Sequence, residues 1–204
     1  MSYETLDRPM SRRRAGVVKR LAPLLEHLYA VAGPSPELAG FLKRHNINQR
    51  NAEAYCGVLT VALAKFFSDN QAERVFVFDP DGIPAVVIEG YEADAYSPMD
   101  LIAWPLFQPH LFAVAIREAD MLGAWKMVRR NGAPLYVYKT PLDWLKASCN
   151  GCVPINRSWA GHWLDRADGP FIVQDMQHGR EIREMLGFAS KRHKVLAPDN
   201  GVAA

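Results

Sequence analysis

The stretch from Arg74 to Gly90, RVFVFDPDGIPAVVIEG, decides how the chain is expected to fold. Two apolar runs flank an Asp-Gly turn, and carboxylates stand near the ends of both runs. Asp-Gly between two apolar runs is a strong signal for a β-hairpin, because a tight turn needs residues that tolerate unusual backbone angles. We therefore predict a β-hairpin over 74–90 with acidic rims.

The residues before this stretch are predicted to be helical. Apolar side chains between Val17 and Val31 recur at spacings of three and four, which is typical of an amphipathic helix. Pro23 is expected to kink this helix or to divide it. A short helix over 37–44 and a longer one over 51–67 follow after a Gly-Pro-Ser-Pro breaker at 33–36.

The residues after Gly90 predict a mixed α/β pattern. Residues 100–106 form a short element that could be helix or strand. Residues 111–122 fit a helix, although 111–116 alone could also form a buried strand, and 135–139 fit a strand. Thr140 and Pro141 then begin a helix that runs to about residue 148. A short apolar run at 171–173 precedes Asp175, which caps a helix over 176–186 that Gly187 ends.

These elements predict an α+β protein in which a helical N-terminal part packs on a small mixed β-sheet containing the hairpin, with flanking helices. We expect a flexible arm over 1–10, a helical part over 11–72, a mixed α/β part over 73–190 and a disordered tail over 191–204, together in one compact unit. Three cysteines are too few for a disulfide framework. With no signal peptide and no apolar run of about 20 residues, we expect a soluble, bacterial-type, cytoplasmic protein without a membrane partner.

The formal net charge of +2 hides a segregation of charge along the chain. Residues 1–73 carry 10 basic and 7 acidic side chains, residues 74–124 carry 2 and 8, and residues 125–204 carry 12 and 7. The basic ends suit a polyanion and the acidic middle suits a cation, although blocks of sequence need not become surface patches.

The densest positive charge lies near the N-terminus. The five side chains that we predict to contact nucleic acid are Arg12, Arg13, Arg14, Lys19 and Arg20. Arginine suits this role because its planar guanidinium donates two parallel hydrogen bonds to phosphate. The alternative for the same run is a solvated helix face that serves solubility.

A second route to nucleic acid comes from the segment ELAGFLKRHNINQRNAEAYCGVL, which covers residues 37–59. Two short helices joined by a polar turn resemble a helix-turn-helix DNA-binding unit, although the glycine common in that turn is missing. The resemblance implies that residues 48–51 would face the groove and that Lys43 and Arg44 would lie near phosphates.

Three carboxylates form the alternative, catalytic hypothesis. Asp79, Glu89 and Asp100 each stand near the end of an apolar element, so they are candidates to converge on one sheet edge and bind Mg²⁺. The segment AVVIEGYEAD also resembles the first motif of toprim domains, which implies a metal-linked role for Glu89. That family's Asp-x-Asp motif follows the glutamate, whereas here Asp79-Pro80-Asp81 precedes it. Turn chemistry alone also accounts for Asp and Gly at these positions.

The remaining reactive side chains give weaker signals. Cys149 and Cys152, with His162 or His178 nearby, are candidate metal ligands, but a second close pair of the kind found in structural zinc sites is missing. The two cysteines follow a helix rather than open one, which disfavours a redox role. We favour no metal and no cofactor. Trp159 and Trp163 share a helical face, where core packing and base stacking are both open.

The sequence therefore predicts, first, a binding protein rather than an enzyme, associated with nucleic acid through its basic terminal segments. The first alternative is a magnesium-dependent phosphoryl-transfer enzyme or nuclease that uses Asp79, Glu89 and Asp100. The second alternative is an adaptor with a protein partner, which an exposed apolar patch would favour.

Overall fold

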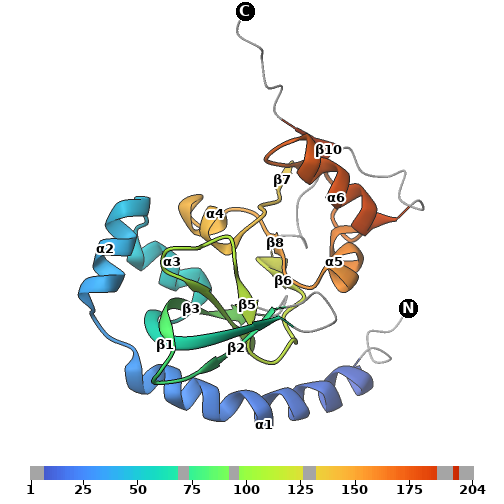
Figure 1. Cartoon of the computed structure of the whole chain (residues 1–204). Coiled ribbons are helices and arrows are strands. Elements are labelled where there is room, and N and C mark those ends of the chain that lie inside the picture. The colour runs from blue at the N-terminus through green and yellow to red at the C-terminus, as the bar shows by residue number, and fades with distance from the viewer. Residues whose placement is uncertain (1–6, 69–73, 92–96, 126–131, 188–194, 198–204) are drawn as a thin grey trace, which may run out of the picture.

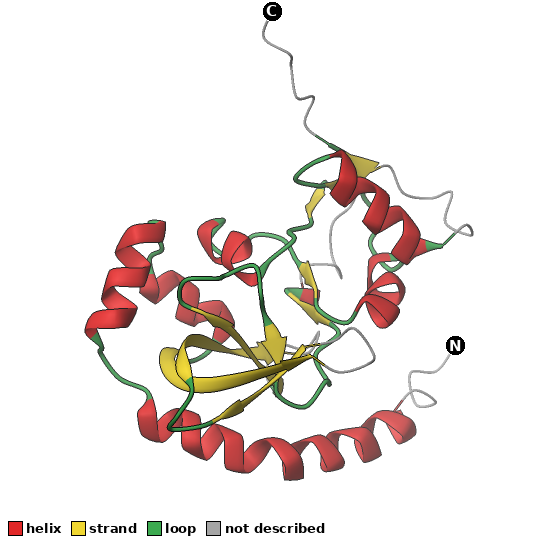
Figure 2. Cartoon of the chain, viewed as in Figure 1, coloured by secondary structure: helices red, strands yellow, loops and turns green. Residues whose placement is uncertain are grey.

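The computed structural model describes residues 7–68, 74–91, 97–125, 132–187 and 195–197, and within its first helix it describes side chains from Gly16 onward. A closed five-stranded barrel lies at the centre, helices surround it, and a smaller α/β part follows on one side (Figures 1 and 2). The α+β class predicted from the sequence is confirmed. No helix in the described part combines the length and apolar character needed to cross a membrane.

Three helices precede the barrel. Helix α1 (Asp7–Val31) is continuous, with Pro23 inside it, so the predicted division is not found. Helix α2 (Pro36–His45) begins at the cap Ser35, and helix α3 is Gln49–Cys56. The helix predicted over 51–67 is wrong, because Gly57 adopts a φ of 62° directly after α3 and the chain then becomes strand.

The barrel consists of β1 (Leu59–Ser68), β2 (Arg74–Phe78), β3 (Ile83–Tyr91), β4 (Pro98–Pro105) and β5 (Ala113–Val114). Its order is β1-β2-β5-β4-β3, closed by the pairing of β3 with β1. Strands β2 and β5 run parallel and the other neighbours run antiparallel, so the sheet is mixed as predicted.

The two strands predicted around the Asp-Gly turn are present, but their pairing differs from the prediction. The hairpin expected over 74–90 is wrong, because β2 and β3 do not pair with each other. Both pair with β1, which lies between them, so the chain crosses β1 in the turn from β2 to β3. Ala64 marks the crossing, since it pairs with Phe78 of β2 and with Ile83 of β3. Gly82 is required there, because a Cβ atom on it would approach the Ala64 backbone to 2.5 Å. Hairpin-like antiparallel neighbours occur at β1–β2 and β3–β4.

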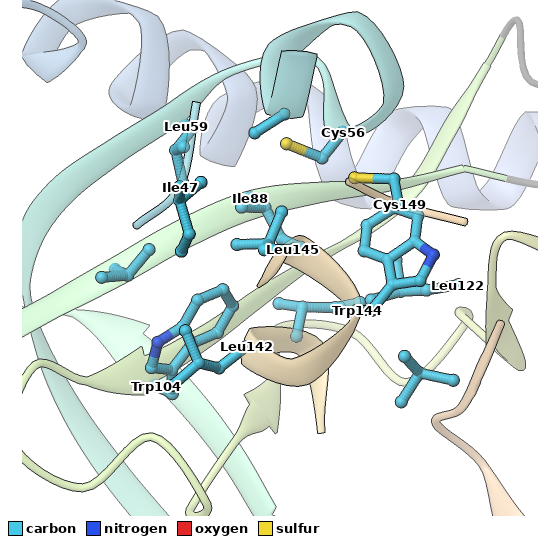
Figure 3. Packing of buried hydrophobic residues seen from close by; sticks show 14 of the residues in the cluster. Ile47, Cys56, Leu59, Ile88, Trp104, Leu122, Leu142, Trp144, Leu145 and Cys149 are labelled. Atoms are coloured by element: carbon cyan, nitrogen blue, oxygen red, sulfur yellow. The ribbon is translucent and has the colours of Figure 1, made fainter. Parts of the chain in front are cut away.

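Strands β3 and β4 are buried on both faces. Residues 100–105, which the sequence left open between helix and strand, belong to β4. Alternate side chains enter two different clusters: Val87 and Leu101 pack with α1, whereas Ile88 and Trp104 pack with α2, α3 and α4. Figure 3 shows the second cluster, in which side chains of the helices meet those of the strands. Burial on both faces produces the continuous apolar runs seen in the sequence, because neither face needs polar side chains.

The C-terminal part combines short strands and three helices. Strands β6 (Met121–Leu122) and β8 (Val153–Pro154) pair with each other, while β7 (Leu135–Tyr136), β9 (Phe171–Ile172) and β10 (Val195–Leu196) form a parallel sheet in the order β10-β9-β7. Helices α4 (Pro141–Lys146), α5 (Arg157–Leu164) and α6 (Met176–Leu186) pack around them. The caps predicted at Thr140 and Asp175 are confirmed, since each side chain accepts a hydrogen bond from its helix.

The helix predicted over 111–122 is wrong. Two short strands, β5 and β6, occupy its ends, and a loop over 115–120 joins them. The buried carboxylate of Asp100 accepts hydrogen bonds from the backbone of this loop, and Arg117 adopts a left-handed φ of 61°. These tertiary contacts override the helical periodicity of the segment.

Candidate functional site: a cationic cleft

A cleft of about 620 Å³ lies where the barrel meets the C-terminal part. The barrel contributes Arg74 at the start of β2 and residues 112–114 at β5, and the loop after β5 contributes Arg117. The opposite wall comes from residues 138–140 after β7, from the segment 154–158 that leads into α5, and from one side of α6 between Gln177 and Met185. Segments more than a hundred residues apart thus build one concave site.

The charged side chains that line this cleft are mostly basic. They are Arg74, Arg117, Lys139 and Arg157, against the single carboxylate of Glu181. Arg74 and Arg117 are also the only basic residues between positions 74 and 124, a block that carries 8 acidic side chains. The fold therefore places Arg74 and Arg117 on the same surface as the basic residues of the C-terminal part. This concentration of positive charge favours an anionic ligand.

Arg117 is held in place by its neighbours in the chain and by Asp100. The Asp100 carboxylate accepts hydrogen bonds from the N–H groups of Ala115 at 3.0 Å, Ile116 at 2.9 Å, Glu118 at 2.7 Å and Ala119 at 3.2 Å. Burial raises the pKa of Asp100, and these backbone donors oppose that rise by stabilising the charged form. An L-residue with positive φ is strained, and such strain persists where the surrounding structure enforces it.

Lys139 and Arg157 of the cleft already have carboxylate partners. Lys139 Nζ lies 2.5 Å from Asp175 Oδ2, and Arg157 lies 2.5 Å from Glu181 Oε2. All four side chains are substantially exposed to solvent, so each ion pair contributes little to stability and its carboxylate can be displaced by another anion. A ligand phosphate can replace either carboxylate as the partner of its cation. Arg74 has no ion-pair partner among the residues that the structure describes.

His178 supplies a buried polar group in the cleft lining, with an exposed fraction of only 2%. Its Nδ1 accepts a hydrogen bond from the Gln174 backbone N–H at 3.3 Å, so the neutral ring carries its proton on Nε2. Burial lowers the pKa of His178, and the nearby Lys139 cation lowers it further. This imidazole is therefore a hydrogen-bond donor to a ligand at neutral pH.

The N-terminal end of α5 lies in the same wall. Asn156 caps this helix and its side chain accepts from the Ser158 N–H at 3.1 Å. Amides at a helix N-terminus attract anions, and Asn156, Arg157 and Ser158 all line the cleft. Phe112 and Tyr138 line it as well and provide aromatic surface beside the charged groups. The arrangement suits a ligand that joins a phosphate to a flat, partly apolar group.

The basic N-terminal cluster predicted from the sequence lies on α1. Arg12, Arg13 and Arg14 belong to this helix, but their side chains fall outside the described part. Lys19 is exposed, whereas Arg20 pairs with Glu118 and also reaches the Ile116 carbonyl oxygen at 3.5 Å. Arg20 thus joins α1 to the loop that carries Arg117, although its own charge is balanced by Glu118.

The three carboxylates of the catalytic hypothesis are not brought together. Glu89 pairs with Leu101 and Asp100 pairs with Gly90, so the two carboxylates point to opposite faces of β3 and β4. Asp79 lies in the turn before β3, at the other end of that strand, where it pairs with Lys65 at 2.8 Å. The three carboxylates therefore do not surround one point at which a magnesium ion could bind.

Glu89 is instead a buried anchor for α1. Its carboxylate accepts hydrogen bonds from the hydroxyl groups of Tyr29 at 2.6 Å and Tyr91 at 2.5 Å, and from the Val58 N–H at 3.3 Å. Burial and the hydrogen bond to Glu89 raise the pKa of Tyr29 to about 12. Gly57 is required beside this group, because a Cβ atom there would lie 1.6 Å from Glu89 Oε2.

The other predicted sites are dispersed. Cys149 and Cys152 are buried in two different core clusters, and His162 is exposed on α5. Among the described residues, no group of three or more His, Cys, Asp and Glu side chains is placed to hold a metal ion. Of the tryptophans considered for stacking, Trp159 is 58% exposed and Trp163 donates to Asp120 at 3.2 Å.

The segment that resembles a helix-turn-helix unit does contain two helices, α2 and α3, joined by a short turn. Asn46 takes the left-handed conformation that ends α2, which explains how the turn forms without glycine. Asn48 caps α3 by accepting from the Asn51 N–H at 3.1 Å, so its side chain serves the fold. Lys43 and Arg50 are exposed on these helices.

The cleft residues Arg74, Arg117, Lys139, Arg157 and His178 were not singled out as one site by sequence reasoning. The only sequence signal for two of them was the scarcity of basic residues in the acidic block 74–124. Comparison of the chain with protein-family models, curated proteins and solved structures gives no match.

Proposed function

We propose that the protein binds nucleic acid and that the cationic cleft, defined by Arg74, Arg117, Lys139, Arg157 and His178, holds its phosphate groups. The observation that carries this proposal is the convergence of four cations and a buried imidazole donor on a lining with one carboxylate. Arginine and lysine contacts to phosphate supply most of the sequence-independent affinity for nucleic acid.

The size of the cleft favours a single strand over a duplex. A volume of about 620 Å³ lies in the range of pockets that enclose one small organic ligand, whereas a double helix would span far more surface. Single-strand binding commonly combines cations for the backbone with aromatic rings for the bases, and Phe112 and Tyr138 supply such rings here. Helix α1 contacts the loop that carries Arg117 through Arg20.

The test is fluorescence anisotropy of labelled single-stranded and double-stranded DNA and RNA, measured over a series of salt concentrations. We expect single strands to bind more tightly and their affinity to fall as salt rises, with a slope of about −0.7 per phosphate contacted. Arg74→Ala and Arg117→Ala should weaken binding about tenfold each and reduce that slope.

Lys146→Ala is the matched control, because it removes one exposed cation from the end of α4, outside the cleft lining. It should leave the affinity within about twofold of the unmodified protein. Absence of binding at low salt, or equal effects of the cleft and control variants, would overturn the proposal.

A further inference from the structure

We infer that the cleft takes the phosphorylated end of a nucleic-acid strand, with a terminal phosphate monoester beside His178. This inference rests on the proposed function and deepens it, since it names which part of the strand enters the cleft. It follows from the charge of the cleft, its buried donor and its aromatic wall.

The first argument is the number of donors. A phosphate monoester carries a charge of about −1.5 to −2 at neutral pH and three strong acceptor oxygens, whereas an internal diester carries one charge. The cleft presents the four cations Arg74, Arg117, Lys139 and Arg157. This supply exceeds what one diester can use and matches the demand of a monoester.

The second argument is the buried donor. His178 is exposed by only 2%, and its Nδ1 is already used by the Gln174 N–H, so Nε2–H is the atom left for a ligand. Among the described residues no protein group accepts a hydrogen bond from that Nε2. Nε2 is not one of the fully buried side-chain atoms without a partner in the described part, so it opens into the cleft, where a phosphate oxygen can accept from it.

The third argument concerns the two ion pairs in the cleft. Lys139 forms an ion pair with Asp175, and Arg157 forms an ion pair with Glu181. A ligand must compete with these carboxylates, and a dianionic phosphate competes better than a monoanionic one because its attraction to each cation is larger. The pairs therefore bias the site toward the end of a strand and against its interior.

The fourth argument is the position of the aromatic side chains. Phe112 lies just before β5 and Tyr138 follows β7, and both line the same cleft as the cations. A terminal base can stack on such rings while its phosphate meets the charged groups. The volume of about 620 Å³ accommodates one nucleotide with its phosphate and excludes a continuous duplex.

The experiment compares one single-stranded sequence in three forms, with a 5′-phosphate, with a 3′-phosphate and with hydroxyl groups at both ends, each labelled away from the end under test. We expect one phosphorylated form to bind at least tenfold more tightly than the hydroxyl form. Arg74→Ala and His178→Ala should remove that preference, while Lys146→Ala should keep it. Arg74 is exposed, so its variant stays informative if loss of buried His178 prevents folding.

The outcomes separate this inference from the proposed function. Equal affinity for all three forms, with salt-dependent binding retained, would overturn the strand-end assignment alone. Binding of none of them at low salt would overturn both. Competition by the free mononucleotide at the concentration at which the oligonucleotide competes would assign the cleft to a small phosphorylated ligand and would also overturn the strand-end assignment.

Discussion

Asp100 holds the backbone on both sides of Arg117. The buried carboxylate accepts from the N–H groups of Ala115 and Ile116 before it and of Glu118 and Ala119 after it, and Arg117 between them has a φ of 61°. This contact converts a segment with helical periodicity into a loop. It also places a basic side chain of an acidic block in the cleft lining.

Replacing Arg117 by glycine should stabilise the fold and weaken ligand binding. The left-handed conformation costs an L-residue about 1–2 kcal/mol, which glycine avoids, while the added flexibility of glycine in the unfolded chain offsets about half of that gain. We expect Arg117→Gly to raise the free energy of unfolding by about 0.5–1 kcal/mol. Urea unfolding, together with the anisotropy assay, measures both effects.

Arg117→Ala is the control for this trade-off, because it removes the same charge and keeps the strained backbone. It should lose affinity as Arg117→Gly does, with no gain in stability. A glycine variant that is no more stable than the alanine variant would show that the positive φ carries no strain to relieve.

Asp100→Asn should be destabilising although it preserves the shape of the side chain. One acceptor oxygen becomes an NH₂ group, which faces N–H donors of the loop and leaves them without a partner in a buried site. Losing charged hydrogen bonds of this kind costs about 2–3 kcal/mol. Urea unfolding should show that loss, and binding to the oligonucleotide should weaken because Arg117 is no longer held in place.

A matched change elsewhere separates the loss of a charge from the loss of the loop anchor. Asp79→Asn removes a carboxylate from the partly exposed turn before β3, where it pairs with Lys65. It should change the free energy of unfolding much less than Asp100→Asn does, because an exposed ion pair contributes little to stability. Similar losses in the two variants would contradict the anchoring role of Asp100.

Local signals in the sequence predicted helices α4 and α6, whereas α5 was not predicted. Thr140 and Asp175 stand directly before α4 and α6 and cap them, and Gly187 ends α6, because capping depends on neighbours within one turn. The barrel was not predicted, since its closure depends on the pairing of β1 with both β2 and β3. An Asp-Gly sequence marks a turn. Whether the two strands beside that turn pair with each other, or with a third strand between them, depends on the rest of the sheet.

The candidate site was missed for a related reason. The sequence singled out Glu89 and Asp100 as candidate magnesium ligands near the ends of apolar elements, but position in the sequence does not distinguish a metal ligand from a structural anchor. Their roles depend on which N–H and O–H groups reach them, and most of these groups lie between 15 and 60 residues away in the sequence. The cleft cations are likewise distant in sequence, so only the fold shows that they share a surface.

Glu89→Gln should lower the pKa of Tyr29 from its present value of about 12. Part of the elevation comes from the hydrogen bond to the Glu89 carboxylate and from its negative charge, and glutamine removes the charge. Absorbance at the tyrosinate band, followed while the pH is raised, measures the shift. Tyr29→Phe identifies which part of the titration belongs to this residue, and an unchanged curve in Glu89→Gln would contradict the contact.

The folded protein should lose stability on acidification because of His178. Burial holds the pKa of this imidazole below its ordinary value of 6.5 in the folded state. As the pH falls below 6.5, the unfolded chain therefore binds a proton before the folded chain does, so the free energy of unfolding decreases until the folded pKa is passed. His178→Gln should flatten this dependence, whereas His162→Gln, at an exposed position, should preserve it. Urea unfolding between pH 7.5 and 5 measures the slope, and an equal slope in His178→Gln and the unmodified protein would show that the ring is not buried in its neutral form.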